Sequence, residues 1–162
     1  MRKGVVWDIV RLVVSIVVCQ LAGGLGAFFT SPAIPTWYAS LNKPPFNPPN
    51  WLFFPVWTTL YTLMGIAAFL VWRKGLGERP VRVALGIFGI QLVLNSAWTI
   101  IFFGLYSLFG AVIAIIFLWI AILINILTFW RISKVAGALL IPYIMWVSFA
   151  GILNISIWML NP

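Results

Sequence analysis

Short polar segments divide the chain into five apolar runs, each long enough to cross a bilayer. We place these runs at about residues 9–29, 51–72, 82–103, 105–130 and 135–160. The hydrocarbon core of a membrane is about 30 Å thick, and about 20 helical residues span it. Backbone polar groups in lipid must be satisfied internally, and the runs lack the alternation of barrel strands, so each should be a helix. The sequence therefore predicts an all-α membrane protein, a five-transmembrane-helix bundle that forms a single domain over residues 1–162.

The first run follows a basic start, which is also typical of a secretory signal peptide. Its uninterrupted apolar part, Leu12–Phe29, is 18 residues long. The apolar core of a signal peptide is shorter, about 7–15 residues. We therefore interpret the first run as a retained transmembrane helix.

The few charged residues test the number of spans. Only 7% of the chain is charged, with ten cations and two acidic residues. Five crossings put nine of the cations on one side of the membrane and Lys43 on the other. By the positive-inside rule, the N-terminus is cytoplasmic, and the first loop and the C-terminus are external. We expect an integral protein of a bacterial or archaeal-type cell membrane, and the dispersed cations argue against a nucleic-acid partner.

The first external connection, residues 30–50, is far longer than the joining of two helices requires. Its second half, NKPPFNPPN, holds four prolines in two adjacent pairs. Such pairs fix the backbone and push the preceding residue into extended geometry, so we expect a supple first part followed by a stiff strut. Long loops with structure of their own are often lids or binding elements, with a rigid linker as the alternative.

Aromatic and polar side chains recur at helical spacing in three of the runs. The three stripes are Trp57, Tyr61, Met64 and Ala68; Gln91, Asn95, Trp98 and Phe102; and Tyr143, Trp146, Ala150 and Asn154. Polar groups in hydrocarbon face the interior of a bundle, so the stripes should converge on a shared space. That space is either a polar seam that holds helices together or a pocket, and the deep tryptophans favour a pocket.

The residue inventory excludes most catalytic chemistry. The chain has no histidine, one cysteine (Cys19) and two carboxylates (Asp8 and Glu78). A histidine-ligated haem, a Ser-His-Asp triad and the common zinc sites are therefore ruled out. We predict no metal site and no required cofactor. A neutral, aromatic-rich cavity instead suits a large flat ligand with a few polar edges.

Three stretches carry a resemblance to a known family. They are residues 37–65, 91–104 and 142–154, and the first contains the uncommon pattern WYASLNKPPFNPP followed by VWTTLY. The chain resembles the TspO/MBR family, whose members are called translocator protein, tryptophan-rich sensory protein or peripheral-type benzodiazepine receptor. The resemblance implies a dimeric five-helix bundle. In such a bundle, the first loop closes a pocket for porphyrin-type tetrapyrroles and benzodiazepine- or isoquinoline-type ligands.

The resemblance also implies roles for individual residues. Tyr38 and Pro48 would contact the ligand from the loop, and the indoles of Trp57 and Trp146 would face each other at the ligand. If the protein degrades porphyrin in light, as the resemblance permits, Trp57 and Trp146 would be its catalytic residues. Stripes and resemblance together predict the ligand-binding residues Tyr38, Pro48, Trp57, Tyr61, Asn95, Trp98, Tyr143, Trp146, Ala150 and Asn154.

Several functions stay open on the sequence alone. They are a receptor or sensor for porphyrin-type tetrapyrroles, a light- and oxygen-dependent porphyrin-degrading enzyme with paired tryptophans, and a tetrapyrrole or lipid transporter. The expected partners are a tetrapyrrole or other flat apolar small molecule, membrane lipid, and a second copy of the chain in a homodimer. Small-residue pairs such as Ala22 and Gly26 would allow close packing of helices in such a dimer.

Overall fold

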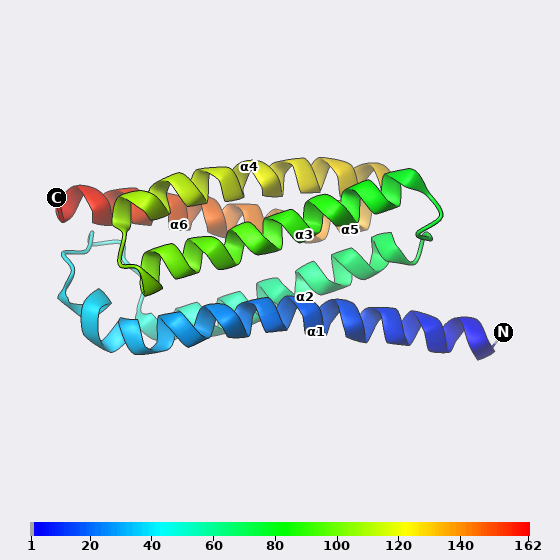
Figure 1. Cartoon of the computed structure of the whole chain (residues 1–162), viewed down its shortest axis with the longest axis horizontal. Coiled ribbons are helices and arrows are strands. Elements are labelled where there is room, and N and C mark those ends of the chain that lie inside the picture. The colour runs from blue at the N-terminus through cyan, green and yellow to red at the C-terminus, as the bar shows by residue number, and fades with distance from the viewer. Residues whose placement is uncertain (1) are drawn as a thin grey trace.

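The computed structural model describes residues 2–162, and its helices run side by side along the long axis of the molecule (Figure 1). Within these residues, five helical segments are long and apolar enough to cross a membrane. The helices are α1 (Arg2–Ala33) with its extension η1 (Ile34–Tyr38), η2 (Asn50–Leu52) leading into α2 (Phe53–Trp72), α3 (Arg79–Thr99) with its extension η3 (Ile100–Gly104), α4 (Leu108–Ile132), and α5 (Lys134–Leu139) followed by α6 (Ile141–Leu160). The predicted all-α membrane fold with five candidate spans is confirmed.

The helices pack so that α1 lies at the edge of the bundle. α1 packs against α2 and also contacts α3 and η3, while α4 packs against α3 and α6. In Figure 1, α1 and α2 form one side of the molecule, and α4 and α6 lie on the opposite side. Most apolar side chains of α1 are exposed, as expected for an outer helix that faces lipid.

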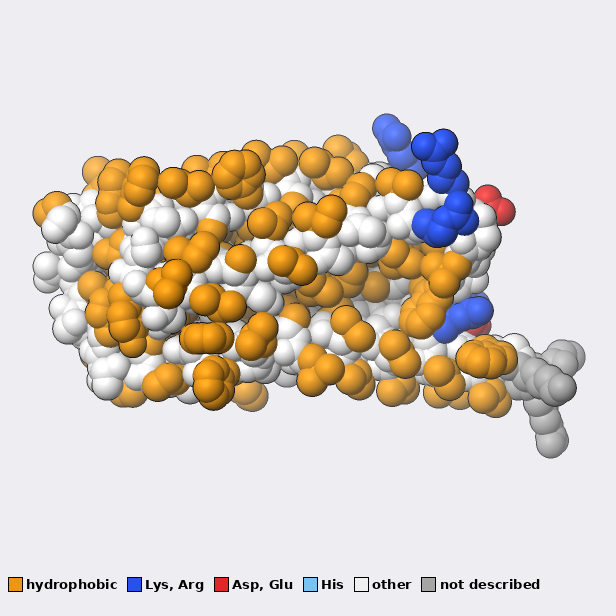
Figure 2. Space-filling view, viewed as in Figure 1, with side chains coloured by type: hydrophobic (Ala, Val, Ile, Leu, Met, Phe, Trp, Pro, Cys, Tyr) orange, Lys and Arg blue, Asp and Glu red, His pale blue; other side chains and the backbone are white. Residues whose placement is uncertain are grey.

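Charge is concentrated at one end of the molecule. Figure 2 shows lysine and arginine side chains gathered at the end that carries the α2–α3 connection, whereas the visible sides of the bundle are largely hydrophobic. Asp8 lies at this basic end, where its carboxylate is 3.4 Å from the Arg11 guanidinium and 3.5 Å from that of Arg73. The opposite end carries the α1–α2 connection with Lys43 and the end of α6.

The α1–α2 connection differs from the expected loop. Residues 30–40, predicted to be supple, are helical, although Pro32 lies inside α1 and Pro35 inside η1. Membrane helices tolerate proline where a local widening and hydroxyl side chains satisfy the freed backbone groups. Here η1 is a π-helix, and the Thr36 hydroxyl donates to the Pro32 carbonyl at 2.7 Å. The irregular part, called the lid below, is residues 41–49.

The last span is broken near its start by a proline. α5 ends at Leu139, Leu140 forms a turn, and α6 begins at Ile141 with Pro142 in its first turn. Proline suits the first turn of a helix, because the N–H that it lacks would have no intrahelical acceptor there. The last span is therefore interrupted at Leu140, between two helices.

Candidate ligand-binding site

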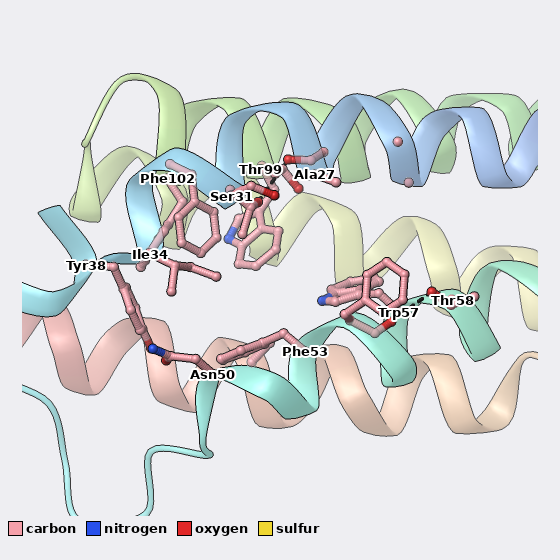
Figure 3. A pocket seen from close by; sticks show the side chains of 18 of the residues that line it. Ala27, Ser31, Ile34, Tyr38, Asn50, Phe53, Trp57, Thr58, Thr99 and Phe102 are labelled. Carbon is pink, nitrogen blue, oxygen red and sulfur yellow. Dashed lines mark hydrogen bonds between the residues drawn. The ribbon is translucent and has the colours of Figure 1, made fainter. Parts of the chain in front are cut away.

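A cavity of about 350 Å³ lies between α1, α2, α3 and α6, in the half of the bundle next to the lid (Figure 3). Its wall is mostly apolar. The aromatic residues that line it are Tyr38, Phe53, Phe54, Trp57, Tyr61, Trp98, Phe102 and Phe103. A concave, mainly apolar space with aromatic side chains and a few polar groups is typical of a small-molecule site.

Two indoles lie next to each other on the cavity wall. Trp57 and Tyr61 are one turn apart on α2, and their rings stack with centroids 5.6 Å apart. The indole of Trp98, from α3, lies 6.3 Å from that of Trp57 at an interplanar angle of 34°. Neighbouring helices thus combine to present aromatic surfaces on which a flat ligand can stack.

A chain of buried polar groups lies behind this aromatic wall. The Tyr61 hydroxyl donates to Asn95 Oδ1 at 2.7 Å, and Asn95 Nδ2 donates to the Tyr143 hydroxyl at 2.7 Å. The Tyr143 hydroxyl in turn donates to Gln91 Oε1 at 2.9 Å. All four side chains are buried, and the chain joins α2, α3 and α6. These groups bind one another, so they stabilise the floor of the cavity.

Another hydrogen bond joins α3 to α6 at the cavity wall. Trp98 Nε1 donates to Asn154 Oδ1 at 3.2 Å, and Asn154 Nδ2 donates to the Leu108 carbonyl at 3.2 Å. The polar atoms of these two side chains are therefore engaged within the protein. Trp98 consequently offers a ligand its ring surface, since its N–H is already bonded.

The structure brings together most of the residues predicted from the sequence. Lining the cavity are Tyr38, Trp57, Tyr61, Trp98, Ala150 and Asn154. Asn95 and Tyr143 lie directly behind the wall in the polar chain. Pro48 is buried within the lid.

Trp146 is not among the residues that line the cavity, and the indole next to Trp57 is that of Trp98. The Trp146 indole lines an outer groove between α2 and α6, with its ring centroid 6.3 Å from Phe53 and 5.4 Å from Phe149. Three residues of helix turn by about 300°, so Trp146 is offset by about 60° from Tyr143, toward α2.

The α1 wall of the cavity was not predicted from the sequence, where small-residue pairs such as Ala22 and Gly26 indicated only close helix packing. Its glycines and alanine leave the space that the cavity occupies. A Cβ on Gly23 would lie 2.6 Å from carbons of the Tyr61 ring, and one on Gly26 would lie 3.4 Å from Thr99 Cγ2. The sequence signal for this wall was the run of small residues in α1, which faces large aromatic side chains in the structure.

The lone cation of the lid has a structural role. Lys43 Nζ donates to the carbonyls of Tyr38 and Leu41 at 2.8 Å and to that of Ala39 at 3.2 Å. These carbonyls lie at the end of the first helical segment, where backbone acceptors lack helical partners and a cation is favourable. The Tyr38 hydroxyl also donates to Asn47 Oδ1 at 2.6 Å, which ties the lid to η1.

The lid is also tied to the end of α6. The Asn42 backbone N–H donates to Asn161 Oδ1 at 3.0 Å, and Asn161 Nδ2 donates back to the Asn42 carbonyl at 2.9 Å. Phe46 of the lid contacts Phe149 of α6 with ring centroids 6.4 Å apart. Contacts with η1 and with α6 therefore hold the lid over the bundle.

The fold and cavity together define a small helical membrane protein with an aromatic-lined cavity under a proline-rich lid. The TspO/MBR family model matches residues 15–159, and the chain belongs to this family, as the resemblance in its sequence indicated.

Relatives match nearly the whole chain. "Tryptophan-rich protein TspO" of Chlorobaculum tepidum is 44% identical over 96% of this chain and 98% of its own length. "Protein CrtK" of Rhodobacter capsulatus is 40% identical over 90% of this chain and 89% of its own length. "Translocator protein" of Homo sapiens is 38% identical over 85% of each chain.

Proposed function

We propose that the protein is an integral membrane receptor or sensor whose cavity binds porphyrin-type tetrapyrroles and benzodiazepine- or isoquinoline-type molecules. The observation that carries this proposal is the aromatic wall formed by Trp57 and Trp98 inside a mainly apolar cavity. Ring faces attract flat aromatic ligands by stacking and by burial of apolar surface. A relative named "Tryptophan-rich sensory protein" in Cereibacter sphaeroides agrees with a sensing role.

The size of the cavity limits how a ligand is held. At about 350 Å³, it lies at the small end of the range for drug-sized ligands, which is about 300–1,000 Å³. A benzodiazepine-sized molecule therefore suits its interior. A tetrapyrrole macrocycle is larger, so one edge would extend through the opening of the cavity.

We also propose that the basic end lies in the cytoplasm and the lid outside. The cations of the α2–α3 connection and of the start of α5 lie at one end of the bundle, and Lys43 lies at the other. Cytoplasmic loops are enriched in lysine and arginine. The cavity, which lies next to the lid, would then be in the outer half of the membrane.

The proposal is tested by titrating the protein with protoporphyrin IX and following tryptophan fluorescence in the wild type and porphyrin absorbance in variants. We expect saturable quenching in the wild type. Trp57→Leu should weaken affinity about tenfold, because a stacking surface worth roughly 1–1.5 kcal/mol is lost. Trp146→Leu is the matched control and should bind as the wild type does, since Trp146 lies in the outer groove. Quenching that never saturates would contradict the proposal.

A second candidate is light- and oxygen-dependent degradation of the bound porphyrin. The neighbouring indoles of Trp57 and Trp98 favour it, because both are on the wall that a bound porphyrin would contact. The test is the visible spectrum of the complex under illumination in oxygen. Loss of the porphyrin bands that requires these two tryptophans would support degradation, and an unchanged spectrum would contradict it.

A further inference from the structure

We propose that ligands enter and leave the cavity sideways, through an opening between α1 and α2 that faces the lipid, while the lid stays closed. The ligand class is a flat amphiphile dissolved in the membrane, with its polar groups on one edge. This inference rests on the proposed function, because it concerns the route to the same cavity.

The position of the opening follows from the burial of the residues that line the cavity. The lining residues of α3, η3 and α6 are buried: Trp98, Thr99, Phe102, Phe103, Ala150, Leu153, Asn154 and Ile157. The exposed lining residues belong to α1, η2 and α2: Gly24, Ala27, Ser31, Asn50, Phe54 and Thr58. The cavity is therefore closed toward the bundle and open along the α1–α2 seam, which is on the outside of the bundle.

One edge of this opening is lined by small residues, and the other carries an exposed aromatic ring. On α1, a Cβ at Gly24 would meet no atom within 4 Å, so the helix leaves space there. On α2, the Phe54 side chain is 75% exposed. Figure 3 shows Ala27 and Ser31 on α1, and Thr58 on α2. A flat molecule can pass such an edge by rotation of one exposed aromatic ring, which is a fast motion.

The alternative route, through the lid, is obstructed by specific contacts. Passage there would break the reciprocal bonds between Asn42 and Asn161, the bond from Tyr38 to Asn47, and the Lys43 contacts with the helix end. Each broken hydrogen bond adds to the barrier, and those made by a cation add the most. The lateral route leaves all of these bonds intact.

The chemistry along the opening indicates how a ligand would be oriented. Ser31 and Asn50 place polar side chains at the part of the opening nearest the lid, whereas Gly24 lies about two turns deeper along α1. The deeper Thr58 hydroxyl is already bonded to the Phe54 carbonyl at 2.8 Å. An amphiphile in the membrane already has its polar edge near the surface and its ring system in the hydrocarbon. It could therefore slide into the cavity without turning over.

The test compares Gly24→Phe with the matched control Gly89→Phe in proteoliposomes, using protoporphyrin IX delivered from preloaded vesicles. Both glycines are exposed, and an added Cβ meets nothing within 4 Å at either position, so both variants should fold. A third variant, Asn161→Ala, removes the side chain that ties the lid to α6. Stopped-flow quenching gives the association rate, and dilution into empty vesicles gives the dissociation rate.

We expect Gly24→Phe to slow association and dissociation together, by about tenfold or more, since both use the same opening. Gly89→Phe and Asn161→Ala should keep the wild-type rates. The inference is overturned if Asn161→Ala accelerates both rates, or if Gly24→Phe leaves the association rate unchanged. Failure of the proposed function looks different, because the wild type would then show no saturable binding.

Discussion

Tyr61 joins the cavity to the polar chain behind it. Its ring stacks on Trp57 at a centroid distance of 5.6 Å, and its hydroxyl donates to Asn95. The helical spacing of the stripes predicted this convergence, because residues three and four apart share a face. The position of Trp146 could not be predicted in the same way, since a stripe about 80° wide covers both the cavity side and the α2 side of α6.

Gly23 controls the position of Tyr61, and Gly23→Ala tests this dependence. The new Cβ would lie 2.6 Å from two carbons of the buried Tyr61 ring, so the ring or α1 must shift. We expect a loss of about 1–3 kcal/mol in the free energy of unfolding, as for other overpacked interiors. Equilibrium unfolding in detergent measures it. Gly86→Ala, where the added Cβ meets nothing, is the control, and equal stabilities of the two variants would argue against this packing.

At the scale of an element, the first helical segment is longer than its sequence predicts. Pro32 and Pro35 are strong signals for the end of a helix, yet the helical backbone continues to residue 40. The low helix propensity of proline applies to helices in water. Here the widened π-helix η1 and the Thr36 hydroxyl accommodate the prolines. At the end of the segment, Lys43 reaches back from the lid and donates to the Tyr38 carbonyl.

Lys43→Met should loosen the lid without unfolding the bundle. The variant removes the donor to the carbonyls of Tyr38, Ala39 and Leu41 but keeps a side chain of similar length. We expect faster amide hydrogen exchange across the lid and an unchanged unfolding midpoint, because local opening is separate from global unfolding. Lys74→Met, in the α2–α3 connection, is the control. Identical exchange in the lid of both variants would show that the cation does not hold it.

Across the whole molecule, the number of membrane spans and their helical structure were predictable because lipid permits few alternatives to a helix. The cavity was harder to locate, because it depends on which side chains fail to fill the space between helices. The small residues of α1 illustrate this difficulty. Small residues of this kind predict association between helices, and here they pack against Tyr61 and Thr99 of the same chain. They also leave the opening at Gly24.

The proposed orientation is testable by cysteine labelling in intact bacterial cells with a membrane-impermeant maleimide. Ser40→Cys, beside the lid, should be labelled in intact cells, whereas Gly77→Cys, in the α2–α3 connection, should be labelled only after lysis. The natural Cys19 is fully buried and serves as an internal negative control. The opposite labelling pattern would place the basic end outside and reverse the proposed orientation.

The most direct test of ligand binding in this cavity is the location of protoporphyrin IX in an experimentally determined structure of the complex. We predict that the macrocycle lies against Trp57 and Trp98, with one edge in the opening between α1 and α2 and the lid still bonded to Asn161. A macrocycle bound in the outer groove beside Trp146, or on the surface of the bundle with the cavity unchanged, would contradict it.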